Sequence, residues 1–120
     1  MSGEVAFFEL GVEDVERGRV FYEGLFGWRF EPGPSAEGYA IGAGRVPGGI
    51  HGGDKGAAPY LFFQVDDMDA ALARVRELGG VVEDMDVEGG EESAGRWGRF
   101  KLCRDDQGSP FGLHQPPAGT

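Results

Sequence analysis

The sequence is short of cysteine, of basic residues and of long apolar stretches, and each scarcity excludes a class of protein. The single cysteine, Cys103, cannot form an internal disulfide, which is typical of a protein from a reducing compartment. Acidic residues outnumber basic ones 21 to 11, the formal net charge is −10, and no Lys/Arg cluster offsets it. Such a surface repels nucleic acid and anionic lipid, so we expect neither as a partner.

No apolar stretch approaches the roughly 20 residues that cross a bilayer. The opening segment, MSGEVAFFEL, lacks a basic stretch followed by a long apolar run, so we expect no signal peptide. Together with the lone cysteine, this predicts a cytoplasmic protein. The 120 residues fit one domain, which we expect to span residues 1–120.

What the sequence does contain is an internal repeat. The segment Val12–Trp28 (VEDVERGRVFYEGLFGW) recurs as Val65–Val81 (VDDMDAALARVRELGGV), at an offset of 65 − 12 = 53 residues. The repeat places Asp14 on Asp67, each at a position suited to cap a helix. It divides the domain into a module of residues 1–56 and a module of residues 57–120.

Hydrophobic periodicity and glycine positions predict the order β-α-β-β-β in each module. The predicted elements of the first are strands 5–11, 28–30, 39–43 and one ending near residue 52, with a helix from Asp14 to Gly27. Those of the second are strands 60–65, 81–87, 97–104 and 109–115, with a helix from Asp67 to Gly79. The last strands also echo each other, PGGIH at 47–51 against PFGLH at 110–114, at an offset of 110 − 47 = 63.

This tandem arrangement, with FYEGLFGW in the first module and VDDMDAALARVRELGG and DDQGSPFGLHQ in the second, resembles the vicinal oxygen chelate superfamily. That superfamily includes glyoxalase I, bleomycin-resistance proteins and extradiol dioxygenases. The resemblance implies an α+β fold in which two βαβββ modules form a cup-shaped mixed sheet with the helices outside. It also implies that a small molecule sits in the cup and that the chain forms a homodimer.

In metal-using relatives, each module gives one metal ligand from its first strand and one from its last. Carried over onto this sequence, the four positions are Phe7, Gly49, Tyr60 and Gly112. Phe and Gly have no donor side chain, and a neutral phenol is a poor ligand. We therefore expect no metal at these positions and no other cofactor.

Strand alternation then predicts which side chains line the cup. Glu9 follows Phe7 on one face, and His114 follows Gly112, with His51 as its counterpart in the repeat. The predicted ligand-binding set is Phe7, Glu9, His51, Tyr60, Phe62, Gln64, Trp97 and His114. Arg96 and Arg99, beside Trp97, are candidates to attract an anionic or polar ligand. The alternative is that the aromatic residues are ordinary core and that the histidines are hydrogen-bonded or solvated surface groups.

Two classes of function remain open from the sequence. The first is a metal-independent protein that binds an aromatic or drug-like small molecule. The second is a glyoxalase-like enzyme, of lyase or isomerase type, acting on a carbonyl substrate with Glu9, His51 or His114 as catalytic candidates. That enzyme is either metal-free or holds a relocated metal on Glu9, His51 and His114.

Overall fold

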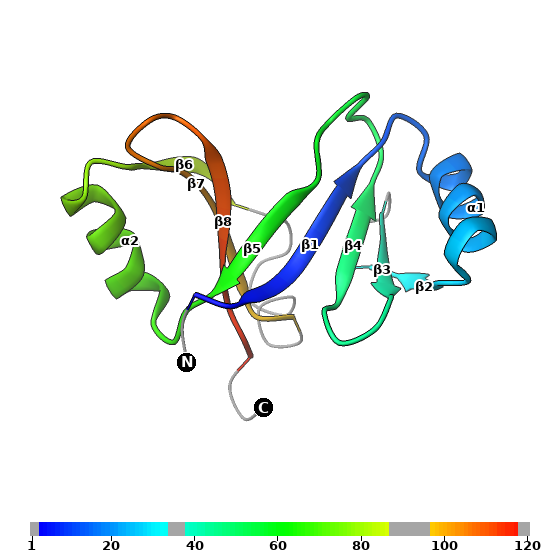
Figure 1. Cartoon of the computed structure of the whole chain (residues 1–120), viewed down its shortest axis with the longest axis horizontal. Coiled ribbons are helices and arrows are strands. Elements are labelled where there is room, and N and C mark those ends of the chain that lie inside the picture. Colours follow the sequence, from blue (N-terminus) through cyan, green and yellow to red (C-terminus); the bar gives the residue numbers. More distant parts are fainter. Residues whose placement is uncertain (1–2, 34–37, 87–96, 118–120) are drawn as a thin grey trace. The chain divides into compact units, whose positions relative to one another are not determined.

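The computed structural model describes residues 3–33, 38–86 and 97–117. The chain forms two compact units, one of residues 7–60 and one of residues 1–6 together with 61–120. Each unit is an α+β layer of four strands and one helix within the described residues (Figure 1). The predicted module division at residue 56 stays a prediction.

The unit of residues 7–60 contains a mixed four-stranded arrangement in the order β2-β3-β4-β1. β1 and β4 are parallel, whereas β2, β3 and β4 pair antiparallel. The elements are β1 (Val5–Gly11), α1 (Val15–Phe26), β2 (Arg29–Pro32), β3 (Gly38–Gly42) and β4 (Gly48–His51).

The second unit has the same plan, with strand order β5-β8-β7-β6 and a parallel pair of β5 and β8. Its elements are β5 (Tyr60–Gln64), α2 (Met68–Glu77), β6 (Val81–Asp86), β7 (Arg99–Arg104) and β8 (Pro110–Gln115). The predicted α+β class and the repeated β-α-β-β-β order are therefore confirmed. The cup shape stays a prediction.

Each helix begins at the aspartate that the repeat indicated. The Asp14 carboxylate accepts hydrogen bonds from the backbone N–H groups of Glu16 and Arg17, at 3.0 and 3.1 Å. The Asp67 carboxylate accepts one from the N–H of Ala70 at 3.1 Å. These bonds satisfy N–H groups that the first helical turn leaves without a partner. Gly27 ends α1 with a φ of 72°, a left-handed conformation that glycine adopts without strain.

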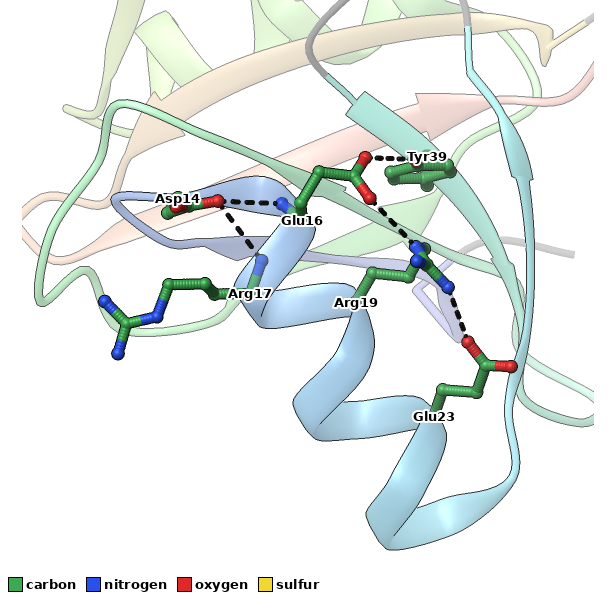
Figure 2. Close-up of polar contacts among 6 residues, drawn as sticks. All are labelled: Asp14, Glu16, Arg17, Arg19, Glu23 and Tyr39. Atoms are coloured by element: carbon green, nitrogen blue, oxygen red, sulfur yellow. Dashed lines mark hydrogen bonds and ion pairs between the residues drawn. The ribbon is translucent and has the colours of Figure 1, made fainter.

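A polar network on the surface fastens α1 to β3 (Figure 2). The Tyr39 hydroxyl donates a hydrogen bond to Glu16. Arg19 contacts Glu16 at 3.2 Å and Glu23 at 2.7 Å, and its guanidinium lies 5.8 Å from the centre of the Tyr39 ring. The hydrogen bonds from Tyr39 and Arg19 lower the pKa of Glu16, and the bond to Glu16 raises the pKa of Tyr39.

The apolar core of each unit lies between its helix and one face of its strands. In the second unit it centres on Met68, Cys103 and Leu113. Packed against these are Val65, Ala71, Leu72, Val75, Val82 and Phe111. In the first unit, Ile50 is fully buried, and a Cβ built on Gly18 of α1 would lie 3.0 Å from its Cδ1 atom. The absence of a side chain at residue 18 lets α1 approach β4 this closely.

The apolar residues of α1 are not all buried. Phe21 and Leu25, which continue the helical spacing that predicted α1, are more than half exposed, as are Val20 and Phe26. Trp28 stacks on Phe26 with ring centres 4.7 Å apart. Trp28 therefore belongs to an aromatic cluster beside the helix. Neither of the two helices in the described residues is long and apolar enough to span a membrane.

Candidate functional site

The face of the first unit that points away from α1 carries two of the polar residues singled out from the sequence, Glu9 and His51. The parallel pairing of β1 with β4 sets Glu9 beside Gly49 and Gly11 beside His51. Leu10 and Ile50 occupy the intervening positions, and Ile50 contacts α1. Because side chains alternate along a strand, Glu9 and His51 lie on the opposite, helix-free face.

On that face, His51 is held between two carboxylates. Its Nδ1 atom lies 2.6 Å from Oε2 of Glu9, and its Nε2 atom lies 2.9 Å from Oδ2 of Asp54. The exposed fractions of the Glu9, His51 and Asp54 side chains are 19%, 34% and 36%. We call these three residues the carboxylate–histidine array, which runs from a sheltered acid to a more exposed one.

Two glycines provide the space that the array occupies. A Cβ built on Gly49 would lie 2.5 Å from Oε1 of Glu9, and a Cβ built on Gly11 would lie 2.5 Å from Oδ2 of Asp54. No real side chain tolerates such distances without movement. The glycines beside each carboxylate are therefore part of the site, because they set where Glu9 and Asp54 lie.

The surroundings shift the ionisation of two groups in the array. Burial raises the pKa of Glu9, although the hydrogen bond from His51 and its positive charge act in the opposite direction. Burial tends to lower the pKa of His51, but the hydrogen bonds to Glu9 and Asp54, with their charges, outweigh it and raise that pKa. The raised pKa of His51 agrees with its position between two carboxylates, because an imidazolium donates from both ring nitrogens.

The array suits hydrogen bonding and proton transfer better than metal binding. Both nitrogens of His51 already face carboxylates, so neither is directed toward a separate ion. Within the residues that the structure describes, no three His, Cys, Asp or Glu side chains are grouped so as to hold a metal. By contrast, Oε1 of Glu9 makes no hydrogen bond in the described part of the chain.

The helix-free face of the second unit is aromatic. Phe62 lies beside Gly112 in the register of β5 and β8, is 1% exposed, and covers the place that a Gly112 side chain would fill. Its ring meets Phe100 edge-on at 5.4 Å, and Phe100 stacks on His114 at 4.3 Å. These three rings form one packed cluster, to which Phe62 contributes as a buried residue.

His114 differs in kind from His51. Its Nε2–H donates to the carbonyl oxygen of Trp97 at 2.9 Å, and burial lowers its pKa. This hydrogen bond ties β8 to the chain at Trp97, just before β7. Gln64 lies opposite His114 in the β5–β8 register.

The remaining predicted residues are placed less distinctively. Phe7 and Tyr60 are partly buried. Arg99 is about half exposed and lies 3.4 Å from Asp69, a surface pair of the kind that stabilises little. Arg96 lies outside the described residues.

Two residues of these clusters were missed from the sequence. Asp54 stands in a Gly/Ala/Lys-rich segment that reads as a simple link. Its only signal was its place three residues after His51, which brings a carboxylate back to the ring when the chain turns. Phe100 could have been found by pairing 99–104 with 110–115 antiparallel, because that register sets Phe100 opposite His114.

The two units use equivalent positions for unlike side chains. The pair Glu9 and Gly49 in the first unit corresponds to Phe62 and Gly112 in the second, at offsets of 62 − 9 = 53 and 112 − 49 = 63. These are the two offsets of the sequence repeat. The glycine is kept in both units, while its neighbour is a carboxylate in one and a phenyl ring in the other.

Comparison with known proteins finds one family that matches part of the chain and two relatives that match most of it. The family described as bleomycin resistance protein-like N-terminal matches residues 5–41. The anthracycline biosynthesis protein DnrV of Streptomyces peucetius is 31% identical over 92% of this chain. DauV of Streptomyces sp. strain C5, also an anthracycline biosynthesis protein, is 30% identical over the same share. The chain spans 46% of the length of each of these two relatives.

Among solved structures, the fold matches methylmalonyl-CoA epimerase from Mycobacterium tuberculosis, with a TM-score of 0.66 and 14% identity over 94% of this chain and 87% of that one. A methylmalonyl-CoA epimerase in complex with methylmalonyl-CoA and NH4+ matches with a TM-score of 0.65 and 16% identity, over 98% and 97% of the two chains. Catechol 2,3-dioxygenase matches at 0.66 and 15% identity over 97% of this chain and 40% of that one. At these identities the likeness concerns the fold.

Proposed function

We propose that the chain binds a planar aromatic small molecule, because its sequence resembles the vicinal oxygen chelate superfamily and its residues 5–41 match the bleomycin resistance protein-like N-terminal family. The anthracycline biosynthesis relatives suggest the chemical class of that molecule, a fused polycyclic aromatic compound that bears hydroxyl and carbonyl groups. The proposed ligand is held without a divalent metal.

The observation that carries this proposal is the position of Glu9. Its carboxylate is mostly sheltered, lies on a strand face that no helix of its unit covers, and is kept in place by His51 and by the bare backbone of Gly49. Sheltering an ionised acid costs several kcal/mol unless it is paired. A titratable group held in this way is a candidate binding or catalytic group.

The ligand contact that we assign to Glu9 is a hydrogen bond accepted by Oε1. A phenolic or aliphatic hydroxyl, or a protonated amine, would donate it. The partly buried Phe7 supplies apolar surface next to the same glycine, since its Cζ would lie 3.3 Å from a Cβ at Gly49. An apolar wall with one directed polar group is typical of a small-molecule site.

Calorimetric titration with an anthracycline aglycone tests this proposal. We expect saturable binding by the wild-type chain and about five- to tenfold weaker binding by Glu9→Gln, because exchanging the charged acceptor for a neutral amide oxygen weakens the hydrogen bond by about 1–1.5 kcal/mol. Glu4→Gln removes one negative charge from an exposed position on the N-terminal side of β1 and is the matched control. Absence of binding, or equal weakening by both variants, would contradict the proposal.

A second function is favoured by the same array. We propose as the alternative that Glu9 acts as a general base, taking a proton from a carbon next to a ligand carbonyl. The C–H bond breaks, an O–H bond forms on Glu9, and the electron pair passes into an enolate. The epimerase fold neighbours make this alternative worth testing, although likeness at 14–16% identity concerns the fold alone.

Deuterium exchange separates binding from catalysis. In D2O, an acid–base enzyme would exchange the proton next to the carbonyl of a bound ketone and lose that exchange in Glu9→Gln, as followed by mass spectrometry. A pure binding protein would leave the ligand unlabelled while still binding it. Elemental analysis of protein purified without an affinity tag tests whether the chain is metal-independent. We expect less than about 0.1 equivalent of any transition metal per chain.

The superfamily resemblance also leads us to propose a homodimer. Analytical ultracentrifugation over a range of concentrations checks this directly. A single species of about 13 kDa at every concentration would contradict it, given the chain mass of 12.8 kDa.

A further inference from the structure

The geometry points to a role for a residue outside the predicted binding set. We propose that Asp54 is a positioning residue: it holds the His51 ring so that Nδ1 faces Glu9 and leaves Oε1 of Glu9 to accept a hydrogen bond from the ligand. This inference rests on the proposed small-molecule site at Glu9 and deepens it.

The first support is the way in which Asp54 is fixed. Its backbone N–H donates to the carbonyl of Val12 at 2.9 Å, and the N–H of Gly53 donates to the carbonyl of Glu13 at 3.0 Å. The N–H of Val12 in turn donates to the carbonyl of His51 at 3.0 Å. The turn that follows β4 is therefore tied to the segment that follows β1, so Asp54 returns to the histidine three residues before it.

The second support is the space made for the Asp54 carboxylate. A Cβ at Gly11 would lie 2.5 Å from its Oδ2 and 2.9 Å from its Cγ, and 3.0 Å from Cβ of Ala57. Only a residue without a side chain at position 11 lets the carboxylate reach Nε2 of His51. Gly11 thus leaves the space in which the Asp54 carboxylate accepts a hydrogen bond from Nε2 of His51.

The third support is that two hydrogen bonds hold the His51 ring more firmly than one. With Glu9 as the sole acceptor, turning the ring about its Cβ–Cγ bond costs one hydrogen bond, because Cδ2 then takes the place of Nδ1. A second acceptor at Nε2, 2.9 Å away, makes the observed rotamer the one in which both N–H groups are satisfied. Orientation of a histidine by a second carboxylate is a general way to pre-organise a site.

Calorimetry and nitrogen NMR on the wild-type chain and four variants test the inference. In Asp54→Ala we expect three- to tenfold weaker binding of the anthracycline aglycone, the loss of about one partly exposed charged hydrogen bond. We also expect the His51 Nε2 resonance to lose its hydrogen-bonded shift. Asp54→Asn keeps an acceptor oxygen of the same reach and should restore the His51 resonance pattern and most of the affinity.

Two further chains separate positioning from charge. Gly11→Ala keeps the Asp54 charge but displaces the carboxylate, so it should behave like Asp54→Ala provided that its circular dichroism matches the wild type. Asp106→Ala removes an equal charge from an exposed position in the turn between β7 and β8 and should change neither readout.

The outcomes distinguish this inference from the proposed function. If the wild-type chain binds no aglycone but Asp54→Ala and Gly11→Ala still alter the His51 resonances, the ligand is wrong and the positioning role stands. If the wild type binds and both variants keep its affinity and its His51 signals, the positioning role is refuted while the binding site remains. Failure of Asp54→Asn to restore the resonances also overturns the role.

Discussion

Gly49→Ala should disturb the Glu9–His51 contact with little loss of stability, whereas Gly112→Ala should lose stability and leave that contact intact. The two glycines are equivalent in the repeat, and neither has a positive φ, so the backbone accepts alanine at both. What differs is the neighbour. The added Cβ would lie 2.5 Å from the carboxylate oxygen of Glu9 in one case and 2.3 Å from the ring of Phe62 in the other.

The magnitudes follow from how each neighbour can move. Replacing glycine by alanine at a compatible position stabilises by about 0.4–1 kcal/mol through the unfolded state. Phe62 is 1% exposed and in edge contact with Phe100, so its ring cannot turn away, and overpacking costs roughly 1–3 kcal/mol. The carboxylate of Glu9 ends a flexible chain and can swing toward water. We therefore expect Gly112→Ala to lose about 1–2 kcal/mol net and Gly49→Ala to stay within about 1 kcal/mol of wild type.

Urea denaturation followed by tryptophan fluorescence measures both stabilities, and nitrogen NMR of His51 reports the displaced carboxylate. Gly49→Ala should remove the Nδ1 hydrogen-bond signature although the protein stays folded, and Gly112→Ala should keep it. Equal destabilisation by the two variants, or a greater loss in Gly49→Ala, would refute the assignment of a flexible neighbour to one glycine and a rigid neighbour to the other.

Four further predictions concern ionisation and the first helix. The raised pKa of His51 contributes stability that is present below pH 6.5 and is lost as the pH rises through the folded-state pKa, so His51→Gln should flatten the stability profile above pH 6.5 in urea titrations. The lowered pKa of His114 has the opposite sign, stability being gained as the pH rises toward 6.5, so the profile of His114→Gln should change only below that pH. Asp14→Ala should lower the free energy of unfolding by about 1 kcal/mol, whereas Asp14→Asn should retain most of it, since both Asp and Asn cap helices. Tyr39→Phe should bring the pKa of Glu16 back toward its ordinary value in a carbon NMR titration, an effect that an unchanged Glu16 resonance would exclude.

The fold could be predicted from the sequence because its signals are local. Asp14 and Asp67 mark helix starts through a short-range hydrogen bond, and alternation within a strand decides which face a side chain takes. The same alternation, with the offset of 63, set His51 on the face of Gly49 and Glu9, where the structure brings the two polar residues to 2.6 Å. What failed was the extent of burial on the helices. Leu78 follows the spacing of α2, but the helix ends at Glu77 and Leu78 is largely exposed.

The contacts of the site were harder to predict because they depend on how a loop returns. Asp54 belongs to a segment whose composition indicates flexibility, and only the backbone bonds to Val12 and Glu13 bring its carboxylate to His51. Likewise, the sequence offered Phe62 as a ligand contact, and nothing in its residue type shows that Phe100 would pack against it. Long-range register, rather than residue preference, decides such cases.

The glycine shared by β4 and β8 also bears on how this kind of chain acquires new chemistry. The repeat gives each unit a glycine that leaves space beside it in the sheet. Glu9 occupies this space in the first unit and Phe62 in the second, and the strand pairing is parallel in both. The residue at one neighbouring position, Glu9 in β1 or Phe62 in β5, therefore decides whether that unit has a carboxylate or a ring beside the glycine. What the two units share is the glycine and the space beside it, and what differs is the side chain that occupies that space.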